Sequence, residues 1–341
     1  MITLRTCAML SLSLLVSSSV FAQCRHSQRA VYYQPTYQPA PAVRTVHYHQ
    51  PVQVQRVQSQ PVVSQTFTSS SGFSSASNVD PVFQANNPNS TYSVDHSSWN
   101  QFLSRNLASD GQGVNRVYYG RVSGQDRQLL GGYLNQLQGT DIRALNRDEQ
   151  FAYWVNLYNA RTVALVLDNY PVQSIQQINS GKAFDQPGVV TVLGKSLSLN
   201  DIESKIVRPV YNNDPRIHYA LNCAAYGCPN LASTAYTSQN LNGRLDQAAR
   251  QFINTDRAVQ RTASGVQVSK IYQWYQEDFG GSPQGVITHL RQYANPTTLA
   301  KLNGVNQIEG YYYDWSLNDS SGYSQGYSSG QPVYSSPQPV Y

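Results

Sequence analysis

Apolar residues gather in the middle of the chain, and their spacing predicts a set of helices around one buried helix. The run 146–168 is apolar on almost every side, which is typical of a helix inside a core. Other segments have apolar positions three and four residues apart, which predicts shorter helices. These segments are residues 98–107, 123–137, 200–207, 241–254, 271–275, 284–294 and 297–302.

Strand signals are short. Residues 189–193 and 196–199 flank Gly194-Lys195, and residues 259–262 and 266–269 flank Ser264-Gly265, so two hairpins are predicted. Segments 217–223 and 311–315 are also predicted to be strands. Helices mixed with hairpins, without a βαβ repeat, favour an α+β fold. We expect one compact domain over residues 94–317, with a small mixed or antiparallel sheet.

Capping signals mark the helix ends. Glu149 follows Asn146 by three residues, Asp126 follows Ser123 and Glu203 follows Asn200, and this is the spacing of a capping box. Prolines stop helices because they lack a backbone N–H. Pro209 is therefore expected to end the helix predicted at 200–207, and Pro171 to end the one at 146–168.

The two flanks differ from this domain. Residues 1–22 combine Arg5, a short apolar run and Val20-Phe21-Ala22, which predicts a cleaved signal peptide and export. Residues 23–93 and 318–341 are rich in Gln, Pro, Tyr and Ser and are expected to be disordered. They are predicted to be plain tethers, or alternatively adhesive segments that contact a cell-envelope polysaccharide or protein. No membrane-spanning segment is expected in the mature protein.

Charge and cysteine content narrow the function classes. The net charge is +5 and the basic residues are scattered, which argues against a nucleic-acid surface. Cys7 leaves with the signal and Cys24 lies in the flank, so Cys223 and Cys228 are the pair within the domain. In an oxidising compartment this pair favours a disulfide. A Cys-x4-Cys pair without a second pair is a poor zinc signature, and neither a metal nor a cofactor is expected.

Residues 214–229 also allow a different reading of the cysteines. Cys223 could be a nucleophile, because His218 precedes it and a thiolate needs a nearby imidazole or positive group. On a regular strand, residues five apart point to opposite faces, so spacing alone does not join them. His289 is the other candidate base, with His96 as a further option in the domain.

A polar stripe marks the predicted central helix. Glu149, Asn156 and Asn159 share one face of a helix that is otherwise apolar. Buried amides and carboxylates need hydrogen-bond partners, so this stripe must meet loop backbone, His218, Arg216 or a ligand. Asn222, next to Cys223, joins Asn156, Asn159 and Arg216 as a candidate binding residue.

Aromatic residues cluster in two places, residues 272–279 and 311–315. Core packing is the simplest role for such clusters. A surface for a carbohydrate or peptide is the alternative, and it requires the rings to be exposed together.

Four motifs carry a resemblance to a known family. Residues 147–160, 197–203, 214–229 and 313–318 together resemble the bacterial and plant family named domain of unknown function 547, over roughly residues 97–317. The family tends to carry histidine where this chain has Ser204, which implies an altered site there. The resemblance implies a pocket formed by the following signature residues. They are Glu149, Asn156, Asn159, Arg216, His218, Cys223 and Cys228.

Two main functions remain open at this point, and an enzyme that uses Glu149 and His218 without a thiol is a minor third alternative. The first is an exported periplasmic, cell-surface or extracellular binding module stapled by a Cys223–Cys228 disulfide. The second is a papain-like or transglutaminase-like hydrolase or transferase acting on amides or thioesters, with Cys223 as nucleophile. In that enzyme His218 or His289 would be the base, and Glu149 or Asn156 would orient it.

Overall fold

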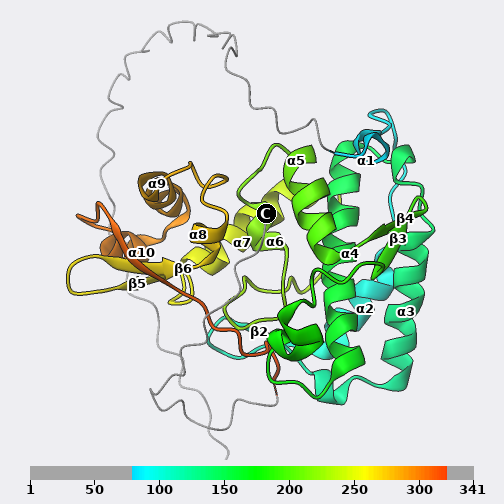
Figure 1. Cartoon of the computed structure of the whole chain (residues 1–341), viewed down its shortest axis with the longest axis horizontal. Coiled ribbons are helices and arrows are strands. Elements are labelled where there is room, and N and C mark those ends of the chain that lie inside the picture. The colour runs from blue at the N-terminus through cyan, green and yellow to red at the C-terminus, as the bar shows by residue number, and fades with distance from the viewer. Residues whose placement is uncertain (1–78, 321–341) are drawn as a thin grey trace, which may run out of the picture. The chain divides into compact units, whose positions relative to one another are not determined.

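The computed structural model describes residues 79–320. The predicted signal peptide, most of the predicted linker and the tail from residue 321 lie outside the described residues, as do Cys7 and Cys24. The α+β prediction is confirmed, with long helices and small sheets in a compact domain (Figure 1). None of the described helices has the length and apolar character needed to cross a bilayer.

Helix α4 (Arg147–Asn169) is the buried central helix that the sequence predicts. The Asn146 side chain accepts a hydrogen bond from the Glu149 N–H and caps the first turn. Trp154 and its neighbours on this helix are fully buried. Helices α2 (Ser97–Asn106) and α3 (Gly124–Gln138) lie beside α4 (Figure 1) and contribute to the larger of two apolar cores.

The remaining helices are short except for α7 and α9. They are α1 (Pro81–Gln84), α5 (Arg208–Val210), α6 (Ile217–Ala220), α7 (Leu241–Ile253), α8 (Ile271–Trp274), α9 (Pro283–Tyr293) and α10 (Pro296–Lys301). Short 3-10 turns cover Tyr119–Arg121, Ile142–Ala144 and Ile175–Gly181. The smaller core lies among α7, α9 and a three-stranded sheet.

Both predicted hairpins are confirmed. Strands β3 (Val190–Val192) and β4 (Lys195–Leu197) pair antiparallel, as do β5 (Val259–Arg261) and β6 (Val266–Ser269). Strand β7 (Ile308–Tyr312) pairs with β6 in parallel. It begins and ends three residues earlier than the strand predicted at 311–315. A third pair, β1 (Leu107–Ser109) with β2 (Asn115–Val117), was not predicted from the sequence.

The predicted strand at 217–223 is wrong. Ile217–Ala220 forms the single helical turn α6, and the chain becomes extended at Leu221. Asp214 and Pro215 start this turn, since the Ile217 N–H donates to the Asp214 carbonyl at 3.0 Å. All residues of α6 are buried, so the apolar and aromatic composition that resembles a strand reflects burial on every side.

The helix predicted at 200–207 forms, but its ends differ. Asp201–Val207 is a π-helix, and Ser198 caps it by accepting from the Asp201 N–H at 3.0 Å. Asn200 makes no side-chain cap, so the predicted Asn200–Glu203 capping box is wrong. Pro209 does not stop the helix either, because α5 follows the π-helix directly and the Tyr211 N–H, beyond the proline, donates to the Val207 carbonyl at 3.2 Å.

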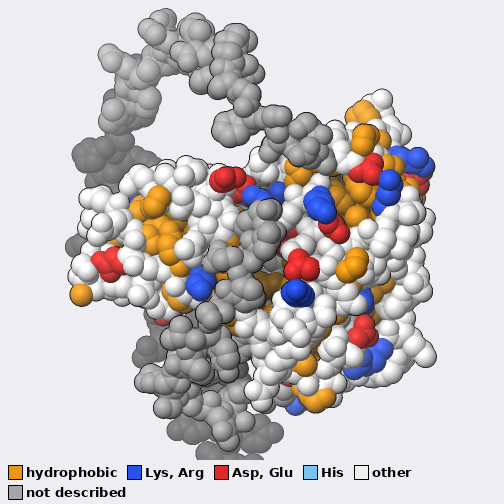
Figure 2. Space-filling model, in the orientation of Figure 1, with side chains coloured by type: hydrophobic (Ala, Val, Ile, Leu, Met, Phe, Trp, Pro, Cys, Tyr) orange, Lys and Arg blue, Asp and Glu red, His pale blue; other side chains and the backbone are white. Residues whose placement is uncertain are grey.

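The folded part extends beyond both predicted boundaries. Val79 and Phe83 are buried in the larger core, ahead of residue 94, and Asp80 caps α1. At the other end, Asn318 is buried and its carbonyl accepts from the Val117 N–H at 3.0 Å. The surface in Figure 2 carries scattered charges of both signs, without a continuous basic patch on the face in view.

Candidate functional site around the Cys223–Cys228 loop

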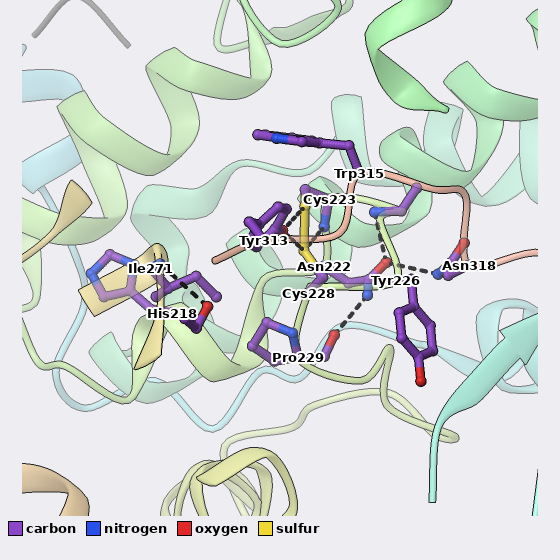
Figure 3. The surroundings of a disulfide bond; sticks show 12 residues. His218, Asn222, Cys223, Tyr226, Cys228, Pro229, Ile271, Tyr313, Trp315 and Asn318 are labelled. Atoms are coloured by element: carbon purple, nitrogen blue, oxygen red, sulfur yellow. Dashed lines mark hydrogen bonds between the residues drawn. A yellow bond between two sulfur atoms is a disulfide. The ribbon is translucent and has the colours of Figure 1, made fainter. Parts of the chain in front are cut away.

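A disulfide joins Cys223 and Cys228 and closes a loop after α6 (Figure 3). Cys228 is buried at 4% exposure, whereas Cys223 is partly exposed. The Cys223 backbone N–H donates to the Cys228 Sγ at 3.0 Å. The Tyr313 hydroxyl lies 2.9 Å from the Cys223 Sγ and 3.1 Å from the Cys228 Sγ. The predicted pairing of the two cysteines is therefore present, and one phenol contacts both sulfur atoms.

The segment after β7 fixes this loop in place. The Gly227 N–H donates to the Asp314 carbonyl at 2.8 Å, and the Tyr226 N–H donates to the Ser316 carbonyl. A side chain at Gly227 would place its Cβ 2.8 Å from the Asp314 nitrogen, so glycine is required at this crossing. Asn222 supports the other side, donating to the Pro229 carbonyl at 2.8 Å.

Three aromatic rings lie together beside the disulfide. The Tyr313 ring centroid lies 4.9 Å from that of Trp274 and 4.6 Å from that of Trp315. The two indoles are 5.5 Å apart. Each of the three residues is partly exposed, so this cluster belongs neither wholly to the core nor wholly to the surface.

His218 lies between two carboxylates where the two cores meet. Its Nε2 is 2.7 Å from the Asp278 Oδ2, and its Nδ1 is 3.6 Å from the Glu203 Oε1. Arg208 donates to both oxygens of Asp278, at 2.7 and 3.0 Å. The imidazole stacks on the Tyr275 ring with centroids 3.9 Å apart. These groups form a buried charged cluster rather than an open site.

Pairing keeps both of these carboxylates ionised. Burial raises the pKa of Asp278, but hydrogen bonds from His218 and Arg208 outweigh it and bring the pKa below the usual value. Burial likewise raises the pKa of Glu203, but His218, Tyr275 and Arg208 together outweigh it, so this pKa is lowered as well. Burial lowers the pKa of Arg208, but Asp278 raises it above its ordinary value. The cluster is thus held by charge pairing.

No thiol–imidazole pair forms among residues 79–320. Figure 3 shows His218 apart from the sulfur atoms. The His289 Nε2 lies 2.9 Å from the Tyr219 hydroxyl, and the His96 Nδ1 lies 2.7 Å from the Tyr133 hydroxyl. The three histidines of the domain therefore sit in three separate polar environments.

The acidic end of the polar stripe binds loop backbone. The Glu149 Oε1 accepts from the Val94 N–H at 2.8 Å, and its Oε2 accepts from the Ser238 N–H at 3.2 Å. Only half of the predicted capping box forms, because the Glu149 carboxylate binds these two loops. Glu149 is fully buried, and its contacts are structural.

The two asparagines of the stripe behave in the same way. Asn156 accepts from the Tyr236 N–H at 3.0 Å and donates to the Tyr236 carbonyl at 2.8 Å. Asn159 donates to the Ala220 carbonyl at 2.9 Å and accepts from the Asn222 N–H at 2.8 Å. Of the partners considered from the sequence, loop backbone is the one that the structure provides.

Arg216 lies away from this stripe. It pairs with Asp214 at 2.7 Å and with Asp246 on α7 at 3.0 Å. The structure therefore brings only two of the signature residues together, Cys223 and Cys228 at the loop. The others have separate contacts, His218 with two carboxylates and Glu149, Asn156, Asn159 and Arg216 with backbone or acidic partners.

Several residues around His218 and the disulfide were missed in the sequence analysis. Glu203 was read as a helix cap, and Arg208, Asp278 and Arg257 were not singled out. Asp278 lies 60 residues after His218, so no local spacing could join them. Glu203 directly follows Ile202 and lies three residues before Ile206. These apolar neighbours are the one signal in the sequence that the Glu203 side chain faces inward.

A surface hollow of about 270 Å³ opens beside Arg208. Ser204, which replaces the histidine expected from the resemblance, lines it together with Lys205 and Glu277. No group of three or more metal-binding side chains occurs within the described part of the chain.

The fold and the loop define a class: an α+β domain built on a buried polar-striped helix and a disulfide-closed loop. Residues 142–253 match the family described as "Protein of unknown function, DUF547", which confirms the resemblance over that segment. The matched segment contains α4, the π-helix, α6 and the disulfide loop. Searches of curated proteins and of solved structures gave no match.

Proposed function

We propose that this chain is an exported cell-envelope protein whose domain is a non-catalytic binding module for a polysaccharide. The observation that carries the proposal is the cluster of Trp274, Tyr313 and Trp315, three partly exposed rings packed on one another. Of these, Tyr313 contacts the disulfide. Sugar rings have apolar faces that pack on aromatic side chains, and binding sites combine such rings with a few polar groups. The sequence of residues 1–22 supports export.

The disulfide supports this proposal by fixing the geometry of the cluster. Tyr313 contacts both sulfur atoms, and the loop carrying them is hydrogen-bonded to the backbone of Asp314 and Ser316, the residues on either side of Trp315. A surface that is ordered before binding loses less conformational entropy when a ligand binds. The loop and the rings therefore act as one preorganised surface.

The thiol-hydrolase alternative has less support. Cys223 is bonded to Cys228, and both ring nitrogens of His218 face carboxylates. A thiol enzyme would need reduction of the disulfide and a new partner for Cys223. The bonded state of Cys223 and the carboxylate partners of His218 therefore favour the binding module.

Binding of the mature protein to purified envelope polysaccharides, measured by calorimetry, tests the proposal. We expect Trp274→Ala and Trp315→Ala each to weaken binding at least about tenfold, because buried interface aromatics typically contribute most. Tyr92→Ala is the matched control, since Tyr92 is 57% exposed and is not part of the cluster. Near-UV circular dichroism checks that each variant is folded. Lack of binding to every polysaccharide, or equal binding by all variants, would contradict the proposal.

A further inference from the structure

The two sulfur atoms of the disulfide differ in access. Cys223 is partly exposed, while Cys228 is buried at 4% exposure. In thiol–disulfide exchange a thiolate attacks one sulfur, and the other sulfur leaves as a thiolate. Access therefore directs attack to the Cys223 Sγ and makes Cys228 the leaving group.

The buried sulfur also has the hydrogen-bond donors that a leaving thiolate needs. The Cys223 N–H donates to the Cys228 Sγ at 3.0 Å, and the Tyr313 hydroxyl donates to it at 3.1 Å. Hydrogen bonds to an anion favour the charged form. A cysteine with such donors is a better leaving group, because the rate of exchange rises as the pKa of the leaving thiol falls.

A buried guanidinium lies beside the same loop. Arg257 is 8% exposed, and its Nη1 donates to the carbonyls of Cys228 and Tyr226 at 2.6 and 3.1 Å. Its Nη2 donates to the Asn230 side chain at 2.9 Å. Within the described residues Arg257 forms no ion pair, and its Nε has no hydrogen-bond partner.

A buried cation without a counterion is costly, and a nearby anion would offset that cost. The field of Arg257 reaches the sulfur-binding phenol. Burial raises the pKa of Tyr313, and the charge of Arg257 opposes this rise. Glu203 and Asp314 each add a smaller contribution that raises the pKa. A thiolate formed at Cys228 would belong to the residue whose carbonyl this cation binds.

We propose that the Cys223–Cys228 disulfide is a thiol–disulfide exchange site for external thiols. The thiolate of the reductant attacks the Cys223 Sγ, a mixed disulfide forms, and the Cys228 thiolate leaves. A second thiol then attacks the reductant's own sulfur in the mixed disulfide and releases the Cys223 thiolate. Two thiols are oxidised to one disulfide, and the protein disulfide is reduced to two thiols. This activity goes beyond polysaccharide binding and does not depend on it.

Exchange of the mature, full-length protein with reduced glutathione tests this proposal. The reaction is quenched with acid at set times, free thiols are alkylated, and the cysteine peptides are identified by mass spectrometry. We expect the mixed disulfide on Cys223, and we expect Tyr313→Phe to slow its formation about fivefold through loss of one hydrogen bond. Tyr311→Phe is the matched control on the adjacent segment and should exchange at the wild-type rate.

A second measurement follows the leaving group directly. In a variant that carries both Cys24→Ser and Cys223→Ser, absorbance at 240 nm should titrate the Cys228 thiol with a pKa below the ordinary value of about 8.5. A parallel reaction uses a reduced dithiol protein in place of glutathione. The reductant that exchanges faster with the Cys223–Cys228 disulfide identifies whether a protein or a small thiol is the preferred donor.

Three results would overturn the proposal. They are exchange that requires denaturant, a mixed disulfide found mainly on Cys228, and equal rates for Tyr313→Phe and the wild type. No polysaccharide is present in these reactions. Failure here therefore leaves the binding proposal standing, and failure of binding leaves this one standing.

Discussion

His289 should make the stability of the domain depend on pH in the mildly acidic range. It lies on α9 at 8% exposure, with its Nε2 2.9 Å from the Tyr219 hydroxyl and its ring packed on Phe279. Burial lowers its pKa from 6.5 to about 4 in the folded protein. The neutral imidazole is therefore the form that the folded protein prefers.

The sign and size of the effect follow from proton linkage. In the unfolded chain the imidazole takes up a proton as pH falls through 6.5, whereas in the folded protein it does so only near pH 4. The unfolded state binds more protons in this window, so stability is full above pH 6.5 and falls as the pH drops toward 4. Between pH 7 and pH 5 the loss from His289 alone is about 2 kcal/mol.

Urea unfolding at pH 7 and pH 5 measures this loss. His289→Gln retains a polar side chain without a titrating imidazole, so it should lose about 2 kcal/mol less than the wild type over this interval. Tyr219→Phe is the control, because it removes the hydroxyl partner but retains the imidazole and its pH dependence. His96, whose pKa burial also lowers, contributes equally to all three proteins. Equal pH-dependent losses in wild type and His289→Gln would refute the reasoning.

Two further substitutions test the buried polar groups. Asp278→Asn should cost about 3–5 kcal/mol of unfolding free energy, since it leaves the Arg208 charge without its carboxylate. Thermal denaturation measures this loss. A loss below about 1 kcal/mol would show that the pair contributes little. Glu149→Ala should cost about 3 kcal/mol, because two buried backbone N–H groups lose their acceptor. Glu149→Gln retains one acceptor, so an equal loss in both variants would contradict this explanation.

Local periodicity was sufficient for most of the helices and both hairpins. The α4 and α9 patterns are long enough to specify helices, and the Gly194 and Gly265 turns determine the hairpin positions. The same reasoning gave the wrong element for segment 217–223, because its helical turn is buried on all sides and the sequence there has no helical hydrophobic period. The parallel pairing of β7 with β6 depends on tertiary contacts that no local pattern encodes.

The candidate site was predictable only where its partners are close in sequence. Cys223 and Cys228 are five residues apart, and their pairing follows from composition and spacing. The partners of His218 are Glu203, 15 residues before it, and Asp278, 60 residues after it. Tyr313, which contacts both sulfur atoms, lies 90 residues from Cys223. These contacts arise because two cores pack on either side of α6.

The polar stripe of α4 compensates for the small amount of β-sheet in this domain. Long connections without regular structure pass over this helix, and their backbone N–H and C=O groups must find partners when they are buried. Glu149, Asn156 and Asn159 each bind such a backbone group. The backbone groups that they bind belong to residues 55 to 89 positions away in the sequence. The side chains that resemble a pocket in the sequence therefore hold the loops on the central helix. Asn159 does the same at the start of the disulfide loop, where its side chain accepts from the Asn222 N–H at 2.8 Å.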